Sequence, residues 1–365
     1  MTSLQEHLEA EYSPQLLSWL TQAVEAEASD LHLVVGQPPV LRVNGELRPL
    51  DEEPLWGHLL KPILEEACPK KIFEQFLVDQ DADFSLQLPI GEHSHRFRVN
   101  YFVSDQQIGA CIRLIPETIP DLNWAGFPEA TARKLTSFRN GLVLVTGVTG
   151  SGKTTTLAML VSRLIAVGNC RVITIEEPVE YRYPTSDGAV VTQREVGMDV
   201  RSFADGLKHG LRQDPDVIMI GEIRDAETAQ MALTAAETGH LVLSTLHTRD
   251  ARGAISRYSD VFPQSVQTEI RAQLATSLRA VVSQHLLPSS VEGEKRWLAL
   301  EVMFNNSPIA SAIRSGKLTS IDNYILSGRD EGMMTLDDSV KELYFENRIT
   351  KETAERFVND PSSLF

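Results

Sequence analysis

Residues 141–156 read GLVLVTGVTGSGKTTT, and this stretch decides the fold of the chain. An apolar run at 141–146 is followed by closely spaced glycines and then by a segment with helical character. Gly147 to Thr154 match G-x-x-x-x-G-K-[ST], the phosphate-loop pattern, in its expected place between a strand and a helix. Backbone N–H groups of such a loop wrap phosphates, and the following helix adds the positive end of its dipole. The stretch predicts an α/β domain that binds a nucleotide; a ligand-free glycine turn is the weaker alternative.

The residues of this loop have distinct expected roles. Lys153 is expected to reach the β- and γ-phosphates of ATP, and the Thr154 hydroxyl to ligate Mg²⁺. The other predicted nucleotide-binding residues are Gly147, Thr149, Gly150, Ser151, Gly152 and Thr155.

Three more apolar runs follow the loop, RVITIEEP (171–178), DVIMIGE (216–222) and HLVLSTLHT (240–248). Short continuous apolar runs are typical of strands buried on both faces, and their alternation with helices indicates a parallel sheet. In such sheets the chemistry lies at the carboxyl ends of the strands. Each run ends in polar or glycine-rich residues, so these ends are the predicted site.

Acidic residues at two of these ends are the catalytic candidates. Glu222 is expected to polarise the attacking water or to act through Mg²⁺; the alternative is that it caps the next helix. Glu176 and Glu177 are expected to help position metal and water. A solvated acidic turn is the other interpretation of that pair. The predicted metal ligands are therefore Thr154, Glu177 and Glu222.

The last run contains two histidines, one near each end. His240 and His247 are seven residues apart, and an odd separation on a strand turns side chains to opposite faces. The sequence therefore argues against a shared zinc ion. His247, at the carboxyl end, is expected to contact the γ-phosphate or relay its presence, whereas His240 is expected to be structural.

Residues 1–116 show a different pattern from the rest of the chain. A helix is predicted over 14–28, strands near 31–35, 95–103 and 108–116, and a hairpin at Asn44-Gly45, which together give an antiparallel α+β domain. Arg98 and Arg113 are candidate anion clamps on this sheet, although the residue pattern alone favours a solvated sheet face. The predicted organisation is an N-terminal domain (1–116), a linker (117–139) and an ATPase domain (140–365) ending in helices, with one helix expected over 274–285.

Composition excludes several functions. With a net charge of -16 and a pI of about 5.0, the chain is a poor candidate for binding nucleic acid or a membrane surface in general. The N-terminus lacks the pattern of a signal peptide, and no apolar run approaches the roughly 20 residues of a membrane span. Membrane contact is therefore expected only through a partner. Three cysteines, Cys68, Cys111 and Cys170, are expected to be reduced thiols.

Taken together, the four motifs resemble those of the secretion-superfamily ATPases (type II/IV secretion, GspE-like), and within them the type IV pilus retraction ATPases, PilT-like and PilU-like. GVTGSGKTTT resembles the family's Walker A motif, ITIEEPVEY its Asp box, DPDVIMIGEIRD its Walker B motif and TGHLVLSTLHT its His box. The resemblance runs from Ala28 to Thr335.

The resemblance implies a RecA-like C-terminal domain, a PAS-like N-terminal domain and a homohexameric ring with nucleotide between the two domains. It implies that Arg98 and Arg113 reach the phosphates. It further implies a cytoplasmic motor that acts on the pilus machinery through an inner-membrane platform protein.

Two departures from the family pattern stand out. The Asp box reads Glu176-Glu177 instead of Glu-Asp. The C-terminal retraction motif is only partly present in PIASAIRSGK (308–317), where Ala310 replaces an arginine. A pilus-assembly or type II secretion ATPase and a weakly hydrolysing accessory subunit of a retraction ring therefore remain the alternatives.

Overall fold

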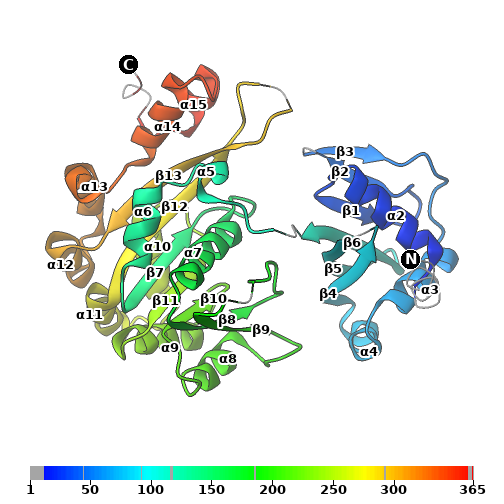
Figure 1. The fold of residues 1–365 in the computed structure, drawn as a ribbon, viewed down its shortest axis with the longest axis horizontal. Coiled ribbons are helices and arrows are strands. Elements are labelled where there is room, and N and C mark those ends of the chain that lie inside the picture. The colour runs from blue at the N-terminus through cyan, green and yellow to red at the C-terminus, as the bar shows by residue number, and fades with distance from the viewer. Residues whose placement is uncertain are drawn as a thin grey trace. The chain divides into compact units, whose positions relative to one another are not determined.

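The computed structural model describes residues 12–360 and 364, apart from 44, 92, 116, 117, 185 and 292. Contacts divide the chain into two compact units, one ending at Thr118 and the other beginning at Ile119 (Figure 1). Residues 116 and 117, where the sequence places the first boundary, lie outside the described part. The segment expected to be a linker contains two short helices of the second unit, α5 (Leu122–Ala125) and α6 (Glu129–Thr136).

The first unit is an antiparallel sheet of six strands in the order β3-β2-β1-β6-β5-β4, with helices α2, α3 and α4. The expected strands and the hairpin between β2 and β3 are confirmed, although Asn44 of the turn lies outside the described residues. Helix α3 was not predicted, since Pro62 interrupts its sequence; α4 and β4 were also missed. The bounds are α2 (Pro14–Glu25), β1 (Asp30–Leu33), β2 (Val40–Val43), β3 (Glu46–Pro49), α3 (Gly57–Ala67), α4 (Lys70–Asp79), β4 (Asp81–Ile90), β5 (His93–Ser104) and β6 (Gln107–Ile115).

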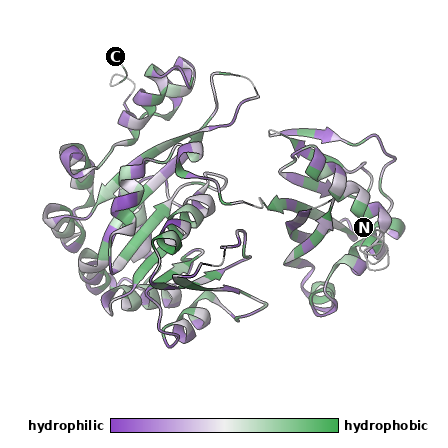
Figure 2. Ribbon diagram, in the orientation of Figure 1, coloured by the Kyte–Doolittle hydropathy of each residue, from purple (hydrophilic) through white to green (hydrophobic). Residues whose placement is uncertain are grey.

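The second unit is built on a seven-stranded sheet in the order β13-β12-β7-β11-β10-β8-β9. Neighbouring strands are parallel except for β13, which pairs antiparallel with β12. Every residue of β7, β10 and β11 is buried, and the central strands are the hydrophobic layer in Figure 2. The predicted α/β class is confirmed. The bounds are β7 (Gly141–Thr146), β8 (Cys170–Glu176), β9 (Ala189–Glu195), β10 (Val217–Ile220), β11 (Leu241–Leu246), β12 (Leu278–Leu287) and β13 (Trp297–Phe304).

Helices pack on this sheet, with α7 against β7, β8 and β11, and α9 against β7 and β11. The chain ends in the small helices α12 to α15, as predicted. None of the helices in the described ranges is both long and apolar enough to cross a membrane. The bounds are α7 (Lys153–Val167), α8 (Phe203–Gly210), α9 (Ala226–Glu237), α10 (Ala251–Asp260), α11 (Gln267–Ser277), α12 (Ser307–Ser315), α13 (Ile321–Ser327), α14 (Leu336–Phe345), α15 (Lys351–Phe357) and the 3₁₀ turns η1 (Leu318–Ser320) and η2 (Arg329–Glu331).

The helix predicted over 274–285 is wrong. Helix α11 ends at Ser277, and the chain continues as strand β12 beside β7. Leu278 and Val281 have helical spacing, but Ala280 and Val282 between and after them are buried as well. In a strand covered on both faces consecutive positions are buried and can be apolar, so periodicity alone does not separate it from a buried helix. Strands β9 and β13 were likewise not predicted.

Candidate nucleotide site

The four predicted motifs meet at one edge of the second sheet. Strands β7, β11, β10 and β8 are consecutive parallel neighbours, with Leu246 level with Thr146 and Ile220 level with Ile175. The phosphate loop follows β7, Glu177 follows β8, Glu222 follows β10 and His247 follows β11. Because parallel strands present their carboxyl ends on the same side, the fold gathers residues that are up to 100 positions apart in sequence.

The phosphate loop spans residues 147–152, between the end of β7 and the start of α7. Gly147 has φ +149, and a Cβ placed there would lie 2.4 Å from Ser151 Oγ and 2.5 Å from the Gln284 carbonyl oxygen. Gly152, at the N-cap of α7, has the left-handed φ +87. Glycine is therefore required at these two positions by close approach and by backbone conformation. Thr149 and Gly150 lie exposed at the tip of the loop.

Lys153 is the first residue of α7, and its side chain turns back into the loop. Its Nζ donates hydrogen bonds to the carbonyl oxygens of Gly147 at 3.0 Å and Val148 at 3.1 Å. Burial lowers the pKa of the Lys153 ammonium, and the carboxylates of Glu222 and Glu180 oppose that effect. Thr154 follows as the second residue of α7, and the Thr155 hydroxyl lies 2.9 Å from the Tyr181 hydroxyl. The Lys153 ammonium group is thus held by two carbonyl oxygens of the loop. A bound phosphate would replace these oxygens as its partner.

The backbone around Glu222 is fixed to both neighbouring strands. The Gly221 N–H donates to the Ile175 carbonyl at 2.8 Å, and its carbonyl accepts from the Thr245 hydroxyl at 2.6 Å. The helix that follows is capped by Asp225, which accepts the Thr228 N–H at 2.8 Å. The alternative interpretation of Glu222 as a helix cap is therefore wrong.

The side chains at this edge form an ion-pair cluster centred on Glu222. One carboxylate oxygen pairs with Arg224 and the other lies 3.2 Å from His247 Nε2. Arg224 also donates to the Glu177 carboxylate at 3.1 Å. Glu222 is the most buried member, with 16% of its side chain exposed, against 59% for Arg224 and 50% for His247. The fold therefore places His247 directly against Glu222 and links Glu177 to Glu222 through Arg224.

Arg224 was missed in the sequence, although a signal was present. In GEIRD (221–225) the buried Ile223 separates Glu222 from Arg224. Residues two apart in an extended segment point to the same side, so the arginine and the acid are placed together.

The two adjacent glutamates of the acidic motif have different surroundings. Glu176 is buried, and its Oε1 accepts hydrogen bonds from the Thr174 hydroxyl at 2.6 Å and from Gln193 Nε2 at 3.1 Å. Glu177 reaches the cluster at the sheet edge. The motif is thus divided between an internal network joining β8 to β9 and the candidate catalytic cluster.

The remaining candidates lie elsewhere. Arg98 and Arg113 are directly opposite each other on β5 and β6 of the first unit. Arg98 pairs with Asp83 at 3.4 Å, and Arg113 with Asp30 at 2.8 Å. His240 lies just before β11, at the opposite end of the strand from His247 as expected, and its Nδ1 is 3.0 Å from the Ala235 carbonyl oxygen.

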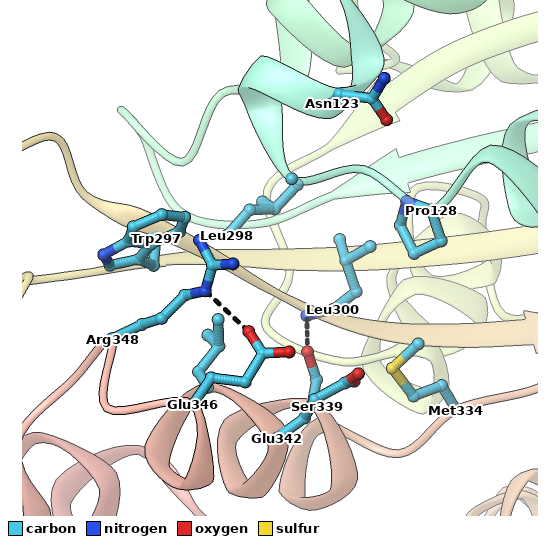
Figure 3. A pocket seen from close by; sticks show the side chains of 12 residues that line it. Asn123, Pro128, Trp297, Leu298, Leu300, Met334, Ser339, Glu342, Glu346 and Arg348 are labelled. Atoms are coloured by element: carbon cyan, nitrogen blue, oxygen red, sulfur yellow. Dashed lines mark hydrogen bonds and ion pairs between the residues drawn. The ribbon is translucent and has the colours of Figure 1, made fainter.

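A cavity of about 230 Å³ lies in the second unit, away from this site. Figure 3 shows it between β13, α14 and the turn at Pro128, with Trp297, Leu300 and Met334 among its walls. Arg348 donates to Glu346 at 2.7 Å beside it. No residue of the phosphate loop or of the Glu222 cluster lines this cavity, so it is not the phosphate site.

The phosphate loop between β7 and α7, together with an acid and a histidine on adjacent strand ends, defines a P-loop nucleotide-binding protein with a RecA-like sheet. The family model of type II/IV secretion system proteins matches residues 8–329. The chain belongs to this family and is a P-loop ATPase within it.

Within the family, the chain is similar over most of its length to ATPases of type IV pili. The type IV pilus retraction ATPase PilT of Pseudomonas aeruginosa is 39% identical over 340 residues, covering 92% of this chain and 96% of that protein. The type IV pilus ATPase PilU of the same organism is 36% identical over 332 residues, covering 91% and 85%. A crystal structure of the pilus retraction motor PilT with bound ADP superposes with a TM-score of 0.83, at 38% identity, over 95% of this chain and 98% of that one. The PilT-like resemblance predicted from the motifs is therefore confirmed.

Proposed function

We propose that this chain is the subunit of a cytoplasmic, homohexameric motor that couples ATP hydrolysis to type IV pilus retraction. The observation that carries the proposal is the meeting of Lys153, Glu222 and His247 at one sheet edge. Support comes from the likeness of the whole chain to PilT, a retraction ATPase. An inner-membrane platform protein of the pilus machinery is the proposed partner.

In this proposal different residues of the second unit bind the phosphates, activate the water and orient the carboxylates. Loop amides from Gly147 to Thr155 hold the phosphates, and Lys153 exchanges its carbonyl partners for phosphate oxygens. Glu222 polarises the attacking water, and His247 responds to the γ-phosphate through its contact with Glu222. Arg224 fixes the orientation of the Glu222 and Glu177 carboxylates.

The oxygen donors at this edge fit a magnesium ion. Thr154 offers a hydroxyl in the first turn of α7, and Glu177 and Glu222 offer two carboxylates whose charge Arg224 offsets only in part. Protein sites for Mg²⁺ commonly use one or two such groups together with substrate phosphates. When bound, the ion neutralises charge that develops on the phosphates. Glu176 takes part only by holding β8 in place, because its carboxylate is engaged internally.

Arg98 and Arg113 are proposed to complete the site from the first unit. The side chains of Arg98 and Arg113 are 31% and 54% exposed; Arg98 pairs with Asp83 and Arg113 with Asp30. Guanidinium groups on a rigid sheet are suited to clamp phosphate oxygens. A guanidinium has five N–H donors, and the contacts with Asp83 and Asp30 are made by Nε, so a phosphate can bind beside the aspartate or displace it.

A weakly hydrolysing accessory subunit is the second candidate, and helix α12 favours it. Ala310, which stands where the family's retraction motif has an arginine, packs partly buried against the core. Arg314, in the last turn of α12, is the remaining arginine of that motif. The likeness to PilU is almost as extensive as that to PilT. An assembly or secretion ATPase is less well supported, because the sequence has no four-cysteine motif.

Two measurements test the proposal. In a strain deleted for this gene, pilus retraction imaged by fluorescence is expected to stop and to return with the wild-type gene but not with Glu222→Gln. Purified wild-type protein is expected to release phosphate from ATP well above the Glu222→Gln background. Phosphate release equal to that background, with retraction restored by either gene, would favour the accessory role. Normal retraction in the deletion strain would refute both roles.

A further inference from the structure

Strand β12 runs beside the strand that feeds the phosphate loop. The two strands are parallel, with Val282 level with Val145 and Ser283 level with Thr146. The next residue of β12, Gln284, is therefore level with Gly147, where the loop begins. Since the sequence pattern indicates a helix here, this proximity emerges only from the fold.

Gln284 lies against the inner side of the loop. Its side chain is buried, and its Nε2 donates a hydrogen bond of 2.7 Å to the Ser151 carbonyl oxygen. The same nitrogen lies 3.3 Å from the position of a Cβ on Gly152, and the Gln284 carbonyl oxygen lies 2.5 Å from that of a Cβ on Gly147. The absence of side chains at these two glycines thus lets the loop close around Gln284.

This hydrogen bond fixes a peptide plane that matters for phosphate binding. The carbonyl of Ser151 and the N–H of Gly152 belong to one trans peptide unit and point in opposite directions. A carbonyl held toward β12 therefore turns the Gly152 N–H away from β12, toward the open side of the loop. Lys153 holds the carbonyls of Gly147 and Val148 in the same way.

We propose that Gln284 is a positioning residue of the phosphate loop, which aims the Gly152 N–H at the nucleotide by holding the Ser151 carbonyl. The proposal rests on the nucleotide site assigned above. Both the second polar atom of this side chain, Oε1, and the Ser151 hydroxyl are buried without a hydrogen-bond partner among the described residues. Among the described residues, the Gln284 side chain therefore makes its hydrogen bond with the phosphate loop, through Nε2.

The adjacent residue of β12 provides a matched control. The Thr146 hydroxyl donates to Ser283 Oγ at 2.9 Å, so Ser283→Ala also breaks a buried hydrogen bond between β12 and β7. That bond ends before the loop and does not orient Gly152. Substitution of either residue is therefore expected to lower the stability of the fold, whereas only substitution of Gln284 is expected to disturb the orientation of the loop.

The test measures the Kd of a fluorescent ADP analogue together with the urea midpoint of each variant. Gln284→Met keeps the length of the side chain and removes its donor, and we expect about fivefold weaker binding, since one buried hydrogen bond is worth about 1 kcal/mol. Ser283→Ala is expected to bind within about twofold of wild type. Equal binding by wild type and Gln284→Met, or equal weakening by both variants, would overturn the proposal. A wild-type protein that binds no analogue would instead refute the nucleotide site itself.

Gln284→Glu adds a measurement that a merely structural residue would not move. A protonated carboxyl can donate to the Ser151 carbonyl, whereas an ionised one repels both that carbonyl and the phosphates. Binding by this variant is expected to strengthen several-fold as the pH falls from 8 to 6, beyond any change seen with wild type. A pH profile parallel to that of wild type would contradict the proposed contact, even if Gln284→Met does not fold.

Discussion

Glu301 makes the stability of the second unit depend on pH. It lies on β13, where its carboxylate accepts the N–H of Ala251 at 2.7 Å, at the start of helix α10. Burial raises the pKa of this carboxyl from 4.5 to about 7; the Ala251 N–H and Arg252 oppose the shift, and Asp250 and Asp322 add to it. The unfolded chain therefore releases this proton at lower pH than the folded protein does. Stability is present at low pH and is lost as the pH rises from about 4.5 to about 7.

The magnitude follows from the two pKa values. At about 1.4 kcal/mol for each pKa unit, ionised Glu301 costs the folded state about 3 kcal/mol above pH 7. Glu301→Gln removes the charge and keeps a carbonyl to accept the Ala251 N–H. It loses about 1 kcal/mol because the hydrogen bond to a neutral acceptor is weaker. We expect a net gain of about 2 kcal/mol at pH 8, or roughly 5 °C in Tm for a unit of this size.

Urea unfolding followed by far-UV circular dichroism, repeated from pH 5 to pH 8, measures this effect. Wild type is expected to lose stability over that range more steeply than Glu301→Gln, and the two curves to converge or cross near pH 5. Asp322→Asn is the control, because Asp322 acts on Glu301 only through its charge and its removal flattens the curve less. Parallel pH curves for wild type and Glu301→Gln would refute the raised pKa and the reasoning from burial.

Four substitutions test the site directly. Lys153→Ala is expected to lower ATP turnover at least ~100-fold, because the loop loses its phosphate-reaching charge; unchanged turnover in a phosphate-release assay would contradict the assignment. Glu222→Gln is expected to lower kcat ~100-fold or more while labelled ADP still binds, and equal loss of ADP binding would argue for a structural role instead. Arg224→Gln is expected to lower kcat about tenfold with a stability change below about 1 kcal/mol, since its ion pairs are partly exposed; Arg224→Lys is the charge-matched control, and full activity of both would exclude positioning by Arg224. Arg113→Ala is expected to lower kcat at least about tenfold with ring size unchanged by light scattering; a full-rate variant would remove Arg113 from the site.

The sequence by itself determined the α/β class, the phosphate loop and the strand ends that carry Glu222 and His247. These features are recognisable within one segment, since glycine spacing expresses a backbone requirement and a continuous apolar run expresses burial of a strand on both faces. Glu222 could also be predicted from the sequence, because an apolar strand followed by Gly221 places this acid at the carboxyl end of the strand. Family resemblance extended this to the type of ATPase.

Only the tertiary structure decided which side chains meet. Arg224 joins Glu222 to Glu177 across two strands, Glu176 is drawn into a network with Gln193 of β9, and Gln284 reaches the phosphate loop from a segment whose spacing suggested a helix. Each contact depends on the strand order β12-β7-β11-β10-β8-β9. Strand order is set by the packing of segments that are distant in sequence. The pattern of apolar residues within one strand does not show which strands lie next to it in the sheet.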